Sequence, residues 1–537
     1  MSSKAHLNQV IASHMVEIQA DAKPDREILV FERGEFGEDV LTYKSLYENS
    51  NKVARLLLDQ GITSGDAFGV FMRNHPEFVH ALLAGTTIGA VMVPIDPRSR
   101  GDRLKFLLNN SGVKALFVSD QCLEQLEEVI ADVPGLRFIS VVKRPEHGID
   151  VPDRYPVLNE TLEKDSWDRV EQQIMDVRQP MQIIYTSGTT GDPKGVKIRN
   201  NRTGLFTILN RLVWRYRPDE ILYTGLSLTH GNAQAVTLFP ALYAGIKAVF
   251  SPRFTKSRIW DICRKYGCTS FSLLGGMMAG IFNEPEKPDD GDNPVKVVIS
   301  AGTPVSMWEA FEKRFNVQIL EWYGAIEGGF AYKPIGKGPI GSFGKPIPGV
   351  MEFRVVDDND SPLPPGEKGE LVCRMMKGET RVDYLGLPDA SKDKTKGGWL
   401  RTGDIVHRDE DGWYFFDFRK GTELRRAGDF IQPDHVEKII GEHADVSEVC
   451  VYGIPAASGA PGESDLVAAV SPFEGRTIDP ASIFQKCRQD LEANFIPSYL
   501  QVVDDIPKTV SEKALDRKLR EDFEKGAGTI YKYEDYQ

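Results

Sequence analysis

The chain has 537 residues, of which 41% are hydrophobic and 27% are charged, and its formal net charge is −13. This length is enough for two or more hydrophobic cores and suggests roughly three domains. The acidic balance and the absence of long basic runs disfavour a nucleic-acid partner and an anionic membrane surface. No apolar stretch of about 18 residues occurs and the N-terminus lacks an apolar segment, so we expect neither a transmembrane helix nor a signal peptide.

Six cysteines are scattered along the chain, and none of them forms a CxxC pair. Isolated cysteines of this kind are typical of reduced thiols in a cytoplasmic protein. No group of histidines and cysteines has the spacing of a metal site. We therefore expect a cytoplasmic protein with free thiols.

Short apolar runs alternate with helical patterns in the first part of the chain. The patterns predict helices over 7–22, 41–58, 76–88 and 101–111, and strands over 67–72, 91–94 and 113–118. Strands that alternate with helices of about ten residues indicate βαβ units and a parallel sheet. We expect the same alternation beyond the polar stretch 143–179, with a helix over 202–216 and strands over 221–228 and 297–304.

The most informative stretch runs from Tyr185 to Val196 and reads YTSGTTGDPKGV. The apolar run 181–185 precedes it, which predicts a strand entering a glycine-rich turn. Glycine permits close backbone approach, so successive N–H groups can form a concave anion site, to which hydroxyls and Lys194 add donors and charge. The spacing differs from a Walker A loop, because only two residues separate Gly191 from Lys194. The stretch predicts a polyphosphate site, and the alternative is a flexible surface loop.

This stretch resembles the phosphate-loop motif of the adenylate-forming superfamily, which contains acyl-CoA synthetases, peptide-synthetase adenylation domains and beetle luciferases. The family's other motifs follow in order, and the resemblance covers nearly the whole chain. It implies an α/β fold: a large N-terminal domain of parallel sheets flanked by helices with a β-rich subdomain, residues 1–419, and a small α+β C-terminal domain, residues 420–537, which is mobile and carries the catalytic lysine. It assigns phosphate binding to Thr186, Ser187, Gly188, Thr189, Thr190, Gly191 and Lys194, with Thr186 also catalytic.

Two later segments match parts of the family that line the acyl pocket. His230 stands where acyl-activating relatives carry a histidine, whereas amino-acid-activating domains place an aromatic–Asp pair in this region. The alternative for His230 is a hydrogen-bonded core histidine. The second segment contains Gly275, Gly276 and Met277, and its alternative is a Met-containing core stretch. Glycine in the pocket leaves room for a bulky acid or brings backbone inward. The remaining predicted pocket residues are Gly275, Gly276, Met277, Ile326 and Gly328.

A small-residue turn formed by Ala301, Gly302 and Thr303 matches the turn that lies against adenine in relatives, where a side chain would block the flat base. The next motif, EWYGAIEGG from Glu321 to Gly329, resembles the family's Tyr-Gly-x-Thr-Glu. Its tyrosine can stack on adenine. The predicted nucleotide contacts here are Trp322, Tyr323 and Gly324.

Glu327 in the same motif offers a hard oxygen ligand, which suits Mg²⁺ held by few carboxylates and by phosphate oxygens. The resemblance makes it a metal ligand and a catalytic residue, and the alternative is a solvated surface acid. The motif departs from the family at Ile326, where a threonine usually stands near the α-phosphate. Losing that hydroxyl forfeits one hydrogen bond.

The sequence GWLRTGD contains Asp404, which matches an aspartate that accepts hydrogen bonds from both ribose hydroxyls. Arg419 matches an arginine that also touches the ribose, although Phe418 replaces the glycine that usually precedes it. The pair Asp411-Gly412 predicts a hairpin between these two sites. Gly421 stands where the family carries an Asp or Lys hinge, and it permits wide backbone excursions.

The C-terminal part has an α+β pattern, with helices over 433–442 and 480–493 and strands over 446–454 and 465–471. Gly428 lies in a segment that meets the pantetheine arm of coenzyme A in relatives. The sequence PKTVSEK resembles the family's closing motif, so Lys513 takes the place of the catalytic lysine. We expect Ser511 to cap the next helix, which would put Lys513 in its first turn, and we expect residues 527–537 to be frayed.

The resemblance implies an ATP- and Mg²⁺-dependent acid–CoA ligase that forms an acyl adenylate and then transfers the acyl group to coenzyme A. Its C-terminal half looks most similar to carnitine/crotonobetaine and steroid- or alicyclic-acid CoA ligases. A homodimer is the family-based expectation. One alternative is an adenylating enzyme that loads a carrier protein, and another is a pseudo-enzyme that only binds nucleotide or acid. Four departures favour the pseudo-enzyme, Ile326, Phe418, Gly421 and Glu512, and five retained residues oppose it, Lys194, Glu327, Asp404, Arg419 and Lys513.

Overall fold

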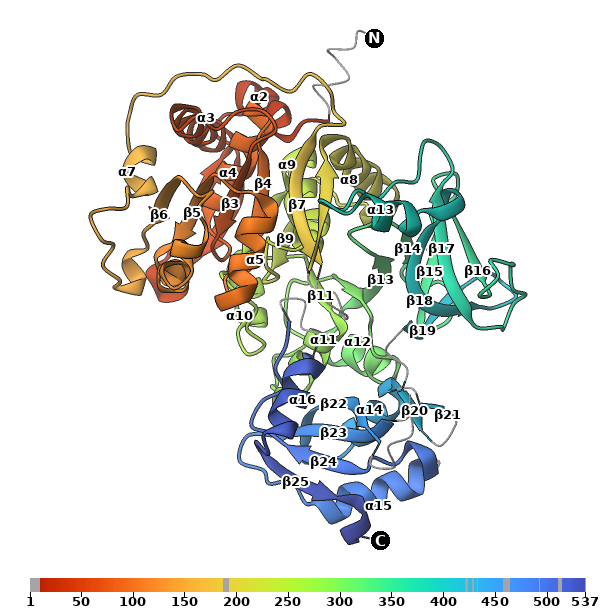
Figure 1. Ribbon diagram of the computed structural model, residues 1–537. Helices are drawn as coiled ribbons and strands as arrows, with labels where there is room; N and C mark the ends of the chain where they lie inside the picture. Colours follow the sequence, from red (N-terminus) through yellow and green to blue (C-terminus); the bar gives the residue numbers. More distant parts are fainter. Residues whose placement is uncertain are drawn as a thin grey trace. The chain divides into compact units, whose positions relative to one another are not determined.

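The computed structural model describes residues 10–186, 193–420, 424–426, 429–431, 433–456, 464–491, 493–509 and 514–536. The chain forms two compact units (Figure 1). The first comprises Met1–Glu352 and Arg374–Leu400, and the second comprises Phe353–Cys373 and Arg401–Gln537. The large unit contains mostly parallel sheets flanked by helices, and the small one is α+β. The predicted fold class is confirmed. No helix in the described ranges is long and apolar enough to cross a membrane.

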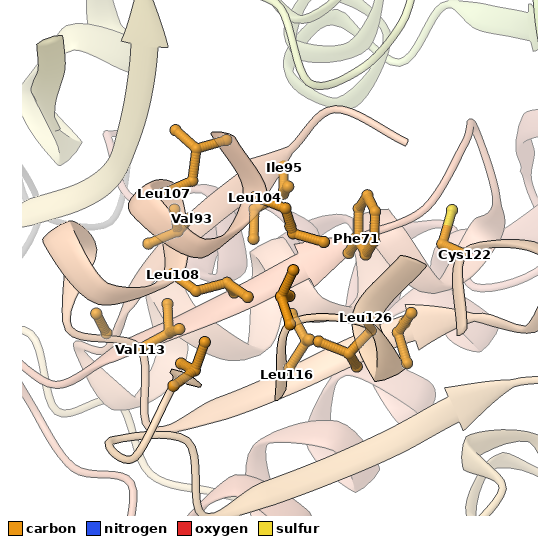
Figure 2. Packing of buried hydrophobic residues seen from close by; sticks show 14 of the residues in the cluster. Phe71, Val93, Ile95, Leu104, Leu107, Leu108, Val113, Leu116, Cys122 and Leu126 are labelled. Atoms are coloured by element: carbon orange, nitrogen blue, oxygen red, sulfur yellow. The ribbon is translucent and has the colours of Figure 1, made fainter. Parts of the chain in front are cut away.

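A six-stranded sheet in the first unit carries the expected phosphate stretch. Its order is β6-β5-β3-β4-β7-β8, and only β7 and β8 pair antiparallel. Leucines of the helix over Gly101–Ser111 pack onto apolar strand residues to form a core that Figure 2 shows at close range. The strands are β3 (Ala67–Phe71), β4 (Val91–Ile95), β5 (Ala115–Ser119), β6 (Phe138–Val142), β7 (Pro180–Thr186) and β8 (Lys194–Arg199), and the helices α4 (Pro76–Ile88) and α5 (Gly101–Ser111).

The second sheet of this unit holds the strands that lead to the adenine and metal motifs. Its order is β2-β1-β10-β9-β11-β12-β13-β14-β15, with parallel pairing from β1 to β13. The strands are β1 (Glu27–Glu32), β2 (Glu38–Thr42), β9 (Ile221–Thr224), β10 (Lys247–Phe250), β11 (Ser270–Leu274), β12 (Val297–Ala301), β13 (Gln318–Gly324), β14 (Phe330–Lys333) and β15 (Ser342–Pro346).

Helices surround this sheet in the first unit. The expected helix over 202–216 is shorter and irregular, because α8 (Thr203–Leu209) continues into the π-helical η6 (Asn210–Trp214). A second π-helical turn, η7 (Ala233–Leu238), follows His230. π-Helical turns are frequent at functional sites. The other α-helices of this unit are α2 (Ala12–Ala22), α3 (Tyr43–Asp59), α6 (Leu123–Glu127), α7 (Leu158–Leu162), α9 (Phe239–Ala244), α10 (Ile259–Tyr266), α11 (Gly275–Phe282), α12 (Trp308–Phe315) and α13 (Pro388–Lys394).

The second unit confirms the expected hairpin at Asp411-Gly412. Strands β18 (Leu400–Arg408) and β19 (Tyr414–Arg419) pair antiparallel, and Gly412 has φ 79°. The α+β part follows, with strand order β22-β23-β24-β25. Its elements are β20 (Leu424–Arg426), β21 (Asp429–Ile431), α14 (Pro433–Gly441), β22 (Val446–Pro455), β23 (Ser464–Pro472), α15 (Pro480–Asp490), β24 (Tyr499–Val502), α16 (Asp516–Glu524) and β25 (Thr529–Lys532).

Two expectations for the C-terminal part are wrong. Residues 527–536 are ordered, because β25 pairs with β24 and Tyr531, Tyr533 and Tyr536 pack against the core of this unit. The final helix begins later than expected, at Asp516 with Leu515 as its N-cap, and Ser511 and Lys513 lie outside the described residues.

Candidate active site

The base of the glycine-rich stretch is an antiparallel hairpin. Thr186 at the end of β7 lies opposite Lys194 at the start of β8, and the Thr186 hydroxyl donates to the Lys194 carbonyl at 3.4 Å. The Lys194 side chain is exposed. The predicted phosphate contacts between the two strands, Ser187, Gly188, Thr189, Thr190 and Gly191, lie outside the described residues.

A short segment around Tyr384 runs along β8. The Lys197 N–H donates to the Asp383 carbonyl at 2.9 Å, and the Leu385 N–H donates to the Gly195 carbonyl at 2.8 Å. Between these bonds, Tyr384 forms a bridge with Val196. The sequence analysis missed this tyrosine, because no local pattern shows that its segment returns to a strand almost 200 residues earlier.

Tyr384 joins two predicted functional residues that are far apart in the sequence. The Lys194 Nζ lies 5.4 Å from the centroid of the Tyr384 ring. The Tyr384 hydroxyl donates to Glu327 Oε1 at 3.2 Å. The structure therefore brings the predicted phosphate-binding cation and the predicted metal ligand to the same tyrosine.

A half-buried arginine holds the turn that carries Glu327. The Arg202 guanidinium donates to the carbonyl oxygens of Ile326 and, at 3.3 Å, of Ala325. Burial lowers the pKa of Arg202 to about 10, and the charge of Glu327 opposes this shift. Arg202 therefore fixes the backbone at the position where the family usually has threonine. The sequence analysis missed it, since a lone arginine outside the motifs gives no signal.

A buried carboxylate holds the predicted adenine turn. The N–H groups of Gly302 and Thr303 donate to Glu321 Oε1 at 2.7 and 3.3 Å, and the Thr303 hydroxyl donates to the other carboxylate oxygen. Burial raises the pKa of Glu321 to about 7, although these hydrogen bonds lower it. Ala301 ends β12 beside this turn, and Gly302 has φ 77°.

The aromatic residues of the adenine motif have different surroundings. Trp322 is buried and packs against Phe330 and Trp214, with ring centroids 5.5 and 5.7 Å away. Tyr323 is half-buried, and its ring lies 4.7 Å from that of Phe343. A Cβ on Gly324 would approach the Trp322 ring to 2.7 Å, so glycine is required there.

Part of the predicted acyl pocket gathers around His230. A Cβ on Gly231 would lie 3.0 Å from Ile326 Cδ1, which places Ile326 beside this segment. Within the described ranges, His230 Nε2 and both amide atoms of Asn232 are buried without a hydrogen-bond partner. Burial lowers the pKa of His230 to about 4, so its ring is neutral at pH 7. Asn232 was not in the predicted pocket.

The other predicted pocket residues lie on α11 and after Glu327. A Cβ on Gly275 would lie 1.9 Å from the Gly302 carbonyl oxygen, so this glycine serves close backbone contact with the adenine turn. Gly276 is exposed and Met277 is buried. Gly328 has φ 143°, and a Cβ there would lie 3.0 Å from Leu400 Cδ2.

In the second unit the structure brings the two predicted ribose residues together. Asp404 is buried and lies opposite Arg419 across the β18–β19 hairpin, and Arg419 Nη1 donates to Asp404 Oδ1 at 3.2 Å. Strands β20 and β21 pair antiparallel, from Leu424 with Ile431 to Arg426 with Asp429. Gly428 and Lys513 themselves lie outside the described residues.

Comparison with known proteins identifies the family. The model of the AMP-binding enzyme family matches residues 16–378, and that of the AMP-binding enzyme C-terminal domain matches residues 435–513. The chain belongs to the AMP-binding enzyme family. This membership confirms the resemblance that the motifs indicated.

This AMP-binding enzyme is also similar to curated relatives along most of its length. It is 28% identical to the crotonobetaine/carnitine–CoA ligases of Salmonella paratyphi B and Salmonella typhi, over 92% of this chain and 96% of each relative. Among solved structures, the anthranilate CoA ligase AuaEII in complex with anthranoyl-AMP has a TM-score of 0.83 at 21% identity and covers 98% of this chain and 99% of its own. A benzoate CoA ligase from Burkholderia xenovorans has a TM-score of 0.80 at 19% identity, with 95% and 99% coverage.

The described residues of this AMP-binding enzyme also bear on the predicted metal. They contain no group of three or more His, Cys, Asp or Glu side chains that could hold a metal ion. Glu327 stands as a single carboxylate with one oxygen bound by Tyr384. This donor set fits Mg²⁺ that binds through one carboxylate and the phosphates of a nucleotide.

Proposed function

We propose that this AMP-binding enzyme is an ATP-dependent acid–CoA ligase. In the first step a carboxylate oxygen attacks the α-phosphorus of ATP, the bond to the β-phosphate breaks, and pyrophosphate leaves. In the second step the sulfur of coenzyme A attacks the acyl carbon and AMP leaves. The observation that carries the proposal is the connection of Lys194 to Glu327 through Tyr384, in a chain whose family and CoA-ligase relatives match over most of its length.

The residues of the first unit supply charge and position for adenylation. Lys194 and Thr186 bind the β- and γ-phosphates at the mouth of the hairpin, and Glu327 would hold Mg²⁺. Bound Mg²⁺ offsets phosphate charge and assists the departure of pyrophosphate. Catalysis of this kind depends mainly on positioning and on charge stabilisation. The turn from Ala301 to Thr303 and the ring of Tyr323 receive adenine.

The second unit supplies the remaining contacts. Asp404 and Arg419 bind the ribose, Lys513 bridges the carboxylate and the α-phosphate, and Gly428 leaves room for the pantetheine arm. In this proposal the C-terminal domain, residues 420–537, rotates between the two steps, so that Lys513 acts only in the first. A homodimer, a dependence on Mg²⁺ and a cytoplasmic location belong to the same proposal.

The acid pocket is built around His230, Asn232 and Ile326. Buried polar atoms normally have a hydrogen-bond partner. A ligand group or an ordered water would supply this partner to His230 Nε2 and the Asn232 amide. A neutral imidazole and an amide suit a neutral hydrogen-bonding group of the acid. The rings of Trp214, Trp322 and Phe330 pack on one another.

The test is acid-dependent release of pyrophosphate, measured with and without coenzyme A for the wild type and for Lys513→Ala. The acids include linear, aromatic, alicyclic, hydroxylated and quaternary-ammonium examples. We expect release that falls by at least about 100-fold in the variant, since a cation in a dry site contributes several kcal/mol. Lys525→Ala serves as the control.

The products distinguish the alternatives. An acyl-CoA product in the wild type supports the ligase. Acyl-AMP that accumulates in the presence of coenzyme A points to a carrier protein as the acceptor. Binding of ATP without release of pyrophosphate for every acid contradicts the proposal and favours a binding protein.

A further inference from the structure

Tyr384 contacts two side chains, Lys194 and Glu327, whose charges must stay separate in the proposed reaction. Within the described residues Lys194 and Glu327 form no ion pair with each other, and each of them contacts Tyr384. A direct Lys–Glu pair would neutralise the cation that binds phosphate and the carboxylate that holds a metal. Tyr384 instead offers its ring face to Lys194 and its hydroxyl to Glu327 Oε1. Each charge is held in place without being neutralised by the other.

The backbone fixes the position of the Tyr384 ring. The side chain is 5% exposed, and hydrogen bonds on both sides attach its segment to β8. The Tyr384 N–H donates to the Ser391 hydroxyl at 2.9 Å, which ties the segment to the helix over Pro388–Lys394. A side chain set by this many bonds can define the positions of two mobile charged groups.

We propose that Tyr384 is a positioning residue that sets the places of Lys194 and Glu327 for nucleotide and metal. The inference rests on the proposed function of this site. The two contacts have separate consequences. The hydroxyl occupies one oxygen of Glu327 and orients the carboxylate toward a metal ion, whereas the ring holds the lysine where the β- and γ-phosphates arrive. A hydrogen bond to a charged group and a cation–π contact are both strong enough to measure.

The experiment separates these contacts with two variants, Tyr384→Phe and Tyr384→Leu. The probe is α,β-methylene-ATP, whose dissociation constant is measured by titration calorimetry in EDTA and over a series of MgCl₂ concentrations. Tyr384→Phe keeps the ring and loses the hydroxyl. We expect it to bind the metal-free analogue like the wild type, but to lose about tenfold in affinity at saturating Mg²⁺. Tyr384→Leu loses both contacts. We expect its affinity for the analogue to be about threefold lower than that of Tyr384→Phe, and we expect this further loss in EDTA as well as with Mg²⁺.

Matched controls come from a second lysine–tyrosine contact in the same unit. The Lys265 Nζ lies 4.8 Å from the centroid of the Tyr266 ring, and we expect Tyr266→Phe and Tyr266→Leu to leave both affinities unchanged. The melting temperature of each variant without nucleotide reports on folding. A merely structural role of Tyr384 would lower the melting temperature and weaken binding equally with and without Mg²⁺.

The outcomes also separate this inference from the proposed function. If Tyr384→Phe has the wild-type dependence on Mg²⁺, the positioning role is overturned, while pyrophosphate release by the wild type still supports the ligase. If the wild type binds no analogue under any condition, both the positioning role of Tyr384 and the proposed function are contradicted. Selective loss of the Mg²⁺-dependent affinity in Tyr384→Phe supports the inference.

Discussion

Two turns in the first unit lie after neighbouring parallel strands and are held in opposite ways. The turn after β12 gives its N–H groups to the buried carboxylate of Glu321. The turn after β13 gives the carbonyl oxygens of Ala325 and Ile326 to the half-buried guanidinium of Arg202. In both cases an ionisable side chain binds the backbone polar groups of the turn. Both turns therefore present fixed backbone shapes to a ligand, and side chains such as Glu327 carry out the chemistry.

Removing the guanidinium should have the largest effect. In Arg202→Met the two carbonyl groups lose their donor, at a cost of about 1–3 kcal/mol each, and Glu327 loses its fixed position. We expect pyrophosphate release to fall by at least about 100-fold. Arg211→Met, on the exposed side of η6, is the control. Unchanged release in Arg202→Met would mean that the position of this turn is irrelevant to turnover.

Displacing the adenine turn should have an intermediate effect. In Gly275→Ala the added methyl group would lie 1.9 Å from the Gly302 carbonyl oxygen, so backbone must move. Overpacking of this kind costs about 1–3 kcal/mol, and we expect nucleotide affinity to fall about tenfold. Gly276→Ala, at the exposed neighbouring position, should leave the affinity unchanged. The dissociation constant of α,β-methylene-ATP for the two variants checks this, and equal values would contradict it.

Titration of Glu321 should change the stability of the fold, and its sign is specific. The pKa of this carboxyl is about 7 in the folded protein and near 4.5 when unfolded, so between these pH values the folded state holds a proton that the unfolded state has lost. The contribution of Glu321 to stability is therefore present below about pH 4.5 and is lost as the pH rises to about 7, by about 3 kcal/mol in total. Melting temperatures from pH 5 to 7.5 should fall less steeply in Glu321→Gln than in the wild type. Parallel curves for the two proteins would contradict the raised pKa.

The sequence predicted what is encoded locally or by motif. The strand 91–94, the helix 76–88 and the Asp411-Gly412 hairpin all occur, because apolar spacing and turn residues determine them within a few residues. The family motifs also indicated the family. The ordered tail was not predicted, because its acidic residues suggested fraying. The packing of its three tyrosines depends on strand β24 and on the core of the second unit, which the tail sequence does not show.

The residues that hold the candidate site could not be predicted in the same way. Arg202 and Tyr384 lie outside the motifs, and Glu321 entered the analysis only as the first residue of a motif. Their roles come from contacts between segments far apart in the chain, such as Arg202 with Ile326 and Tyr384 with Glu327. A single sequence holds no record of such pairs.

The antiparallel register of β7 and β8 restricts how the glycine-rich stretch can vary in length. Thr186 and Lys194 face each other at the last pair of the ladder. Side chains alternate between the faces of a strand, so a register shift of one residue would turn the lysine to the opposite face. An insertion taken up as a two-residue shift would restore its direction. Length variants of this stretch should therefore be tolerated according to whether the shift is odd or even, and not simply according to its size.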